Sequence, residues 1–135
     1  DEPLMVSVTA AEDTAVLFLH APHMLAPCTQ ICTCHAQLIR NLLFVSARKN
    51  LELSRRAFHT APKTIRGRLL SYLSTQAIHA GSDSFSIPFD RQQLADYLGV
   101  DRSALSAELG RMRRDGLLDF KKNRFRLHVT PDAQV

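Results

Sequence analysis

RQQLADYLGVDRSALSAELGRMRRDGLL, residues 91–118, contains two short segments of apolar side chains at helical spacing, which meet at Gly99. A glycine at that place allows the chain to reverse in a left-handed backbone conformation between two helices. The second segment begins with Arg102 and has three more arginines near its end. The side chains predicted to face inward are Leu94, Tyr97, Leu98, Leu105, Leu109 and Met112. The stretch therefore predicts two short helices joined by a tight turn.

Helix-capping residues surround both segments. Asp90 and Gln93 have the spacing of a capping box at the start of the first helix. Asp101 is placed to cap the second helix, which is predicted to end at Gly116. The helices are thus bounded by residues whose side chains or backbone freedom suit helix ends.

Further elements are predicted on both sides of this pair. Thr60 and Pro62 predict the cap and first turn of a helix that ends at Gly81, and FSIPF after it predicts a short strand. In LLDFKKNRFRLH, apolar and polar residues alternate on either side of Lys122 and Asn123, which suit a two-residue hairpin turn. The order helix, strand, helix, turn, helix, hairpin predicts a winged helix-turn-helix.

A long helix is predicted before this domain. Residues 28–59 contain neither Pro nor Gly, which allows a helix of roughly eight turns. Alternating steps of four and three residues give a seam typical of a coiled coil, formed by Cys28, Cys32, His35, Ile39, Leu42, Ser46, Lys49 and Leu53. We therefore expect a symmetric homodimer with Ile39, Leu42 and Leu53 in its interface.

The first residues have strand character. LMVSVTAAEDTAVLFL consists of two β-prone runs around a polar AAED, which predicts a hairpin or two neighbouring strands. Two strands are marginally stable alone, so they are expected to complete a sheet whose other strands belong to another chain or, as suits a fragment better, lie upstream of Asp1. The chain is accordingly interpreted as a fragment.

Positive charge is concentrated toward the end of the chain. Residues 1–27 hold four carboxylates and no Lys or Arg, whereas residues 102–126 hold eight Lys or Arg against three carboxylates. Such a basic segment favours a polyanionic partner. The sequence has no run of 18 uncharged apolar residues, and its acidic start does not resemble a signal peptide. No membrane partner is predicted, and the expected location is the cytoplasm.

The second helix of a helix-turn-helix places its first residues at base edges in the major groove of double-stranded DNA. Arg102 is at this position, and a guanidinium can donate two parallel hydrogen bonds to guanine. Ser103 and Ser106 are predicted to contact bases beside it. The predicted contacts to the DNA backbone are Arg91, Lys121, Lys122 and Arg124. Farther along the helix, phosphates or acidic residues of the same protein are the expected partners of Arg111, Arg113 and Arg114.

The same stretch resembles the helix-turn-helix of the bacterial Crp/Fnr regulators. The resemblance extends back through TIRGRLLSYLSTQA, HAQLIRNLLFVSARKN and MVSVTAAEDTAVLFL, which look like the first helix of their DNA-binding domain, their dimerisation helix and the closing strands of their sensor barrel. It implies an α+β, mainly α fold with a barrel (jelly-roll) remnant in 1–27, a dimerisation helix in 28–60, a winged helix-turn-helix in 61–130 and a tail in 131–135.

The implied function is a homodimeric transcription regulator that reads inverted half-sites. RNA polymerase is a further partner implied by the family, and a small-molecule effector would bind in the part of the barrel that this chain lacks. Better-known members follow the arginine with glutamate and carry a second arginine on the same helix. Here Ser103 and Ala107 occupy these positions, which predicts a different target sequence.

The cysteines form a cluster in CTQICTCH. On a helix, Cys28, Cys32 and His35 share one face, which allows a metal site or a thiol-based redox sensor as an alternative function. Stable disulfides are not expected in a cytoplasmic protein. Because free cysteine packs as a small apolar residue and these positions coincide with the seam, packing explains them more simply than a metal does.

Two alternatives come from other functional classes. One is an enzyme with Cys32 or Cys34 as nucleophile and His20, His23 or His35 as base. No carboxylate or glycine-rich turn lies nearby to orient the base, so the chain is predicted not to be an enzyme. The other is a winged helix that docks onto proteins and does not bind DNA.

Overall fold

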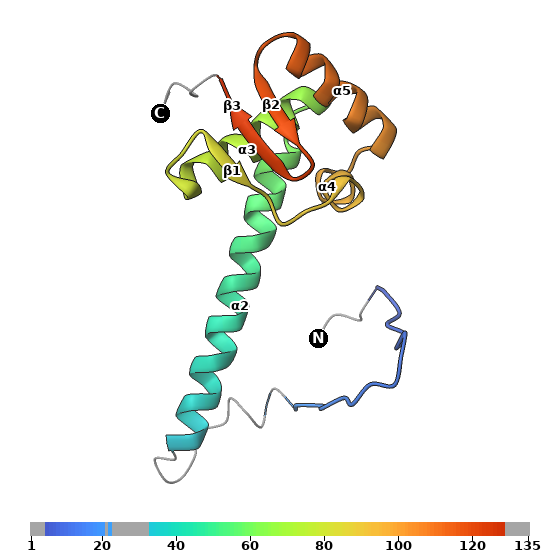
Figure 1. Cartoon of the computed structure of the whole chain (residues 1–135). Helices are drawn as coiled ribbons and strands as arrows, with labels where there is room; N and C mark the ends of the chain where they lie inside the picture. The colour runs from blue at the N-terminus through green and yellow to red at the C-terminus, as the bar shows by residue number, and fades with distance from the viewer. Residues whose placement is uncertain (1–4, 21, 23–32, 129–135) are drawn as a thin grey trace. The chain divides into compact units, whose positions relative to one another are not determined.

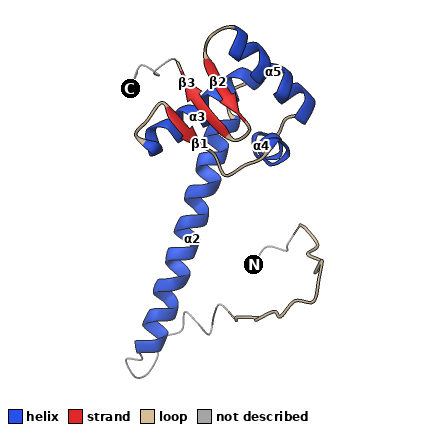
Figure 2. Cartoon of the chain, viewed as in Figure 1, coloured by secondary structure: helices blue, strands red, loops and turns tan. Residues whose placement is uncertain are grey.

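The computed structural model describes residues 5–20, 22 and 33–128. Its elements are α2 (Thr33–Thr60), α3 (Ile65–Ala80), β1 (Ser84–Ser86), α4 (Arg91–Leu98), α5 (Arg102–Arg114), β2 (Leu118–Lys121) and β3 (Arg124–Leu127) (Figure 1). The chain divides into two compact units, 1–46 and 47–135, with the boundary inside α2. Helices predominate over one small sheet, which confirms the predicted α+β, mainly α class (Figure 2).

The second unit has a single core between its helices and its sheet. The strands are antiparallel in the order β1-β3-β2, with Phe125 opposite both Phe85 and Phe120. Helices α3 and α5 contact the sheet, and α4 packs on α5. Of the side chains predicted to face inward, Tyr97 is half-buried and the other five are buried. The core consists of Leu69, Tyr72, Leu73, Phe85, Ile87, Leu94, Ala95, Leu98, Leu105, Leu109, Met112, Leu118, Phe125 and Leu127.

The turn between α4 and α5 has the predicted construction. The Asp90 carboxylate accepts a hydrogen bond from the Gln93 amide at 2.8 Å, and the Gln93 side chain accepts one from the Asp90 amide at 2.9 Å, which completes the capping box. Gly99 has φ +63°, a left-handed conformation that favours glycine. From α3, Arg68 Nη1 donates to the carbonyls of Leu98 at 2.9 Å and Gly99 at 3.2 Å, so this turn is also bonded to α3.

Two predicted boundaries were wrong. Thr60 does not cap α3, because it is still the last residue of α2 and its hydroxyl donates back to the carbonyls of Arg56 and Ala57. The cap is Thr64, whose side chain accepts a hydrogen bond from the Gly67 amide at 3.0 Å. The strand predicted in FSIPF, residues 85–89, instead spans Ser84–Ser86, and Pro88 has no amide hydrogen with which to extend the ladder.

The hairpin predicted near the beginning is not formed. Residues 5–20 contain no strand, and their apolar side chains are exposed. Within the described residues, the three strands of the sheet all lie in 84–127, so no other strand pairs with this segment. Two strands without a partner sheet are marginal in water, which gives the physical reason. The predicted barrel remnant stays a prediction.

The last turns of α2 are bonded to the domain that follows. Arg56 donates from Nε to the carbonyl of Tyr97 and from Nη2 to that of Asp96, both at 3.0 Å. His59 is 3% exposed, and its ring nitrogens lie 2.9 Å from the Tyr97 hydroxyl and 3.2 Å from the Thr75 hydroxyl. Burial lowers the pKa of the His59 imidazole, which favours its neutral form. The end of α2 is therefore part of the folded second unit.

None of the helices in the described part of the chain has the length and apolar character that a membrane span requires.

Candidate nucleic-acid interface

The first turn of α5 presents polar side chains to solvent. Asp101 caps the helix by accepting hydrogen bonds from the amides of Ser103 and Ala104, both at 2.9 Å, and from the Ser103 hydroxyl. These bonds, the one from the hydroxyl first, lower the pKa of the Asp101 carboxyl. The Ser106 hydroxyl donates to the carbonyl of Arg102 at 2.9 Å. Both serines thus use their hydroxyl hydrogens inside the protein and keep oxygen lone pairs for an external donor.

Arg102 is exposed at the start of α5. Among the residues that the structure describes, its guanidinium has no hydrogen-bond or ion-pair partner. All of its donors are therefore available to a ligand.

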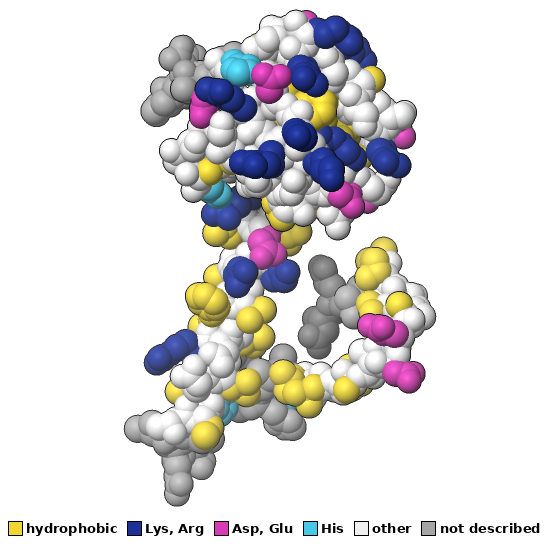
Figure 3. All heavy atoms as spheres, in the orientation of Figure 1, with side chains coloured by type: hydrophobic (Ala, Val, Ile, Leu, Met, Phe, Trp, Pro, Cys, Tyr) yellow, Lys and Arg dark blue, Asp and Glu magenta, His cyan; other side chains and the backbone are white. Residues whose placement is uncertain are grey.

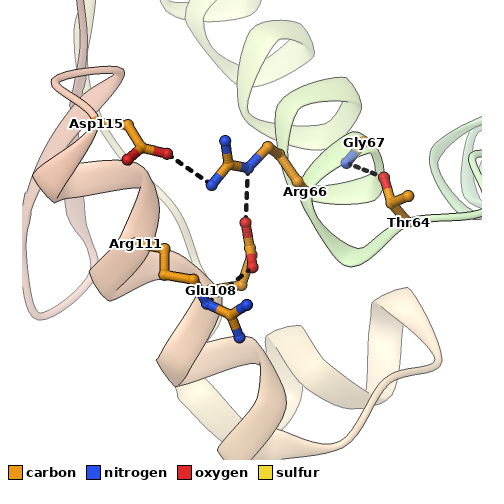
Figure 4. A network of polar contacts seen from close by, with 6 residues as sticks. All are labelled: Thr64, Arg66, Gly67, Glu108, Arg111 and Asp115. Atoms are coloured by element: carbon orange, nitrogen blue, oxygen red, sulfur yellow. Dashed lines mark hydrogen bonds and ion pairs between the residues drawn. The ribbon is translucent and has the colours of Figure 1, made fainter.

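The opposite side of α5 is fixed to α3 by a network of charged groups (Figure 4). Arg66 of α3 donates from Nε to Glu108 at 2.6 Å and from Nη2 to Asp115 at 2.7 Å. Arg111 lies 3.3 Å from the second oxygen of Glu108. The Glu108 side chain is only 11% exposed, so its charge depends on these two arginines for compensation. The network sets the position of α5 on α3 and hence the position of its exposed face.

Glu108→Gln is expected to lower the free energy of unfolding by about 1–3 kcal/mol, because it removes a charged acceptor in a mostly buried site. The matched control is Glu52→Gln, which removes an exposed carboxylate paired with Arg48 and Lys49 on α2 and is expected to leave stability unchanged. Urea unfolding followed by circular dichroism measures both. Equal effects of the two substitutions would show that the Glu108 network contributes no more than a surface ion pair.

The other cations of this region fall into two groups. Arg113 pairs with Asp119 at 3.2 Å and Arg126 pairs with Asp83 at 3.5 Å. Of the three arginines late in α5, Arg111 and Arg113 thus meet acidic residues of the same protein, one of the two predicted outcomes. Of the cations in residues 103–126, the exposed ones that have no ion pair with a described residue are Arg114, Lys121, Lys122 and Arg124.

The hairpin of β2 and β3 carries three of these unpaired cations, Lys121, Lys122 and Arg124, which we call the wing cations. They lie in or beside the two-residue turn, and Lys122 has φ +55°, a conformation that is uncommon for a lysine. Figure 3 shows Lys and Arg side chains gathered over the face of the domain that carries the hairpin. Cations are thus exposed both at the start of α5 and on the wing.

Arg91, predicted to contact the DNA backbone, is only partly exposed. Its guanidinium carbon lies 4.9 Å from the ring centre of Phe120 and 5.2 Å from that of Phe125. Its Nη2 donates to the carbonyl of Lys122 at 2.8 Å. The structure therefore places the Arg91 guanidinium against two aromatic rings and the turn backbone of the wing.

Comparisons with known proteins identify the same DNA-binding domain in this part of the chain. Over 98 residues the chain is 31% identical to the probable transcriptional regulator flp of Lacticaseibacillus casei, a match that covers 73% of this chain and 45% of that protein. The chain thus spans less than half the length of this curated relative. Residues 67–131 match the Crp-like helix-turn-helix domain. This match places residues 67–131 in the Crp/Fnr family.

The residues predicted for a Crp/Fnr dimer interface lie on α2. Ile39 is half-buried, whereas Leu42 is 43% and Leu53 is 66% exposed. Leu38, Leu43, Phe44 and Val45 of the same helix are also exposed apolar residues. A single copy of the Crp/Fnr chain therefore leaves much apolar surface of α2 in contact with water.

The predicted metal or thiol site of this Crp/Fnr protein falls largely outside the described residues, because Cys28 and Cys32 are not among them. His35 is half-buried near the start of α2, and Cys34 is an exposed free cysteine. In the part of the chain that the structure describes, no group of three or more His, Cys, Asp or Glu side chains could hold a metal ion.

Proposed function

We propose that this Crp/Fnr protein is a sequence-specific DNA-binding transcription regulator that acts as a homodimer in the cytoplasm. The observation that carries the proposal is the distribution of charge. Arg111, Arg113 and Arg126 pair with carboxylates, whereas Arg102 and the wing cations are exposed and have no such partner among the described residues. Cations left uncompensated at the start of α5 and on the wing suit the phosphates and base edges of a duplex.

In the proposed complex, α5 lies in the major groove and Arg102 donates two hydrogen bonds to one guanine. Ser103 and Ser106 accept hydrogen bonds from base amino groups, because their hydroxyl hydrogens are already used by Asp101 and by the helix backbone. The wing cations contact the backbone next to this groove. The capping of α5 by Asp101 supports this role, since it fixes the first turn from which these side chains project.

The proposed dimer forms through the exposed apolar side of α2. Two copies related by a two-fold axis would place two α5 helices in inverted half-sites about one helical turn of DNA apart. The match to a protein named as a probable transcriptional regulator supports regulation of transcription as the outcome of this binding.

Binding of the chain to a random-sequence duplex is expected to weaken steeply with salt, because each phosphate contact contributes about −0.9 to the slope of log K against log salt. Lys122→Asn removes one wing cation while keeping a residue that tolerates φ +55°, and it should lower the slope by about one for every sequence tested. Fluorescence anisotropy over a salt series measures this.

Glu52→Gln on α2 provides a folded control that is expected to leave the slope unchanged. A wild-type chain whose affinity for duplex DNA is weak and insensitive to salt would contradict the proposal. That result would favour a winged helix that docks onto proteins.

A further inference from the structure

The turn of the wing is held by the segment that precedes α4. Ile87 donates its amide to the carbonyl of Asn123 at 2.9 Å, and Asn123 Nδ2 donates to the carbonyl of Ile87 at 3.1 Å. The carbonyl of the other turn residue, Lys122, accepts the bond from Arg91. Residues 88–91 and the two turn residues also line one common pocket. Asn123 is therefore bonded to the segment before α4, and Lys122 to the first residue of α4.

Arg91 makes the only one of these three bonds that comes from a charged side chain. Its guanidinium lies over Phe120 of β2 and Phe125 of β3, so it contacts both strands of the hairpin as well as the turn. A cation over aromatic rings is attracted to their faces, and the attraction grows as the cation loses water. Burial lowers the pKa of Arg91, yet a guanidinium remains protonated in proteins.

Arg91 connects the start of α4 to the wing. Arg91 is the first residue of α4, directly after the Asp90 cap, so its backbone is fixed in the helix-turn-helix. Its side chain therefore joins the rigid start of α4 to the wing. The Nη2 bond and the two ring contacts hold the guanidinium against the wing, on the protein side of the hairpin turn.

We infer that Arg91 is a positioning residue that orients the wing cations toward DNA and does not itself contact a phosphate. The inference rests on the proposed DNA binding. Arg91 holds the turn in which Lys122 adopts its left-handed conformation, and this conformation sets the direction of the neighbouring cations. Loss of Arg91 then weakens DNA binding only as long as there are wing cations to orient.

The test measures binding of the full chain to a labelled random-sequence duplex in two backgrounds. One is the wild type, and the other is a wing-neutral variant with Lys121→Gln, Lys122→Asn and Arg124→Gln. Arg91→Met is expected to weaken binding by about tenfold at 0.1 M salt in the wild type, the size of one lost phosphate contact, and by less than about twofold in the wing-neutral variant. Arg91→Lys should be as weak as Arg91→Met, because lysine lacks the planar fork that spans the rings and the carbonyl.

If Arg91 instead contacts a phosphate directly, the opposite results are expected. Arg91→Met would then cost the same in both backgrounds, and Arg91→Lys would restore most of the affinity; either result overturns the inference. The matched control is Arg126→Met, which removes an exposed arginine of β3 that pairs with Asp83. Its effect is expected to be the same in both backgrounds.

A second measurement needs no DNA. The ¹⁵N heteronuclear NOE of the Lys122 and Asn123 amides is expected to fall in Arg91→Met and Arg91→Lys, and to stay at the wild-type value in Arg126→Met. An unchanged NOE in both Arg91 variants overturns the inference even if they bind DNA weakly. If the wild-type chain does not bind the duplex, the proposed function fails, whereas the NOE still shows whether Arg91 orders the turn.

Discussion

Replacing Ile39 and Leu42 with Asp together is expected to convert the protein from a dimer into a monomer. Ile39 is half-buried and Leu42 is 43% exposed in the single chain, so both would gain burial against the second helix of the proposed dimer. Two carboxylates on each helix would instead place four like charges at the proposed two-fold interface. Because simultaneous binding of two half-sites is lost, affinity for a two-half-site duplex should fall by about a hundredfold or more.

Sedimentation equilibrium measures the oligomeric state, and anisotropy measures binding to the duplex. The matched control is Gln37→Asp with Asn41→Asp, which also adds two carboxylates to α2 but outside the predicted seam. The control is expected to remain dimeric. A dimeric Ile39→Asp/Leu42→Asp variant would place the interface elsewhere in the chain.

Arg102→Ala is expected to cost about 1–3 kcal/mol of binding free energy per half-site and to relax the preference at one base pair in each half-site. The reason is that Arg102 is exposed at the first turn of α5 and has no partner within the described residues. A planar fork in this place can read guanine, whereas alanine cannot. The measurement is a panel of single-base variants of a selected duplex, bound by the wild type and by the variant.

Arg113→Ala is the control for this experiment, since Arg113 is an exposed arginine of the same helix that pairs with Asp119 and lies outside the Glu108 network. It should leave the order of preference among the variants unchanged. Should Arg102→Ala weaken binding to every variant equally, Arg102 contacts a phosphate and the proposed base reading is wrong.

Local patterns in the sequence were sufficient to predict most of the winged helix-turn-helix. The Asp90 capping box, the left-handed Gly99 and the hairpin turn at Lys122 each depend on residues only a few positions apart. The wrong prediction that Thr60 caps α3 also comes from a local pattern. Thr60 and Thr64 both have a suitable side chain, and only the structure shows that the α2 backbone continues through Thr60.

Interactions between distant residues could not be predicted in this way. Arg66 and Glu108 are 42 positions apart, and His59 and Tyr97 are 38 apart. In the sequence, Glu108 reads as an ordinary polar residue of a solvent-exposed helix face. The positioning role that we infer for Arg91 depends likewise on two phenylalanines that only the folded hairpin brings beside it. Charge and spacing alone predicted a contact of Arg91 with the DNA backbone, and that contact stays a prediction.

The division of α5 into two faces bears on how such a regulator could acquire new targets. Its buried face carries the core and the Glu108 network, whereas Arg102, Ser103, Ser106 and Ala107 are all exposed. Changes at these four positions would leave the core packing of the helix intact, so under the proposed DNA binding they would alter the bound sequences at little cost in folding. We therefore expect that substitutions which change the DNA target occur mainly at these exposed positions. The residues that hold α5 in place are expected to stay the same.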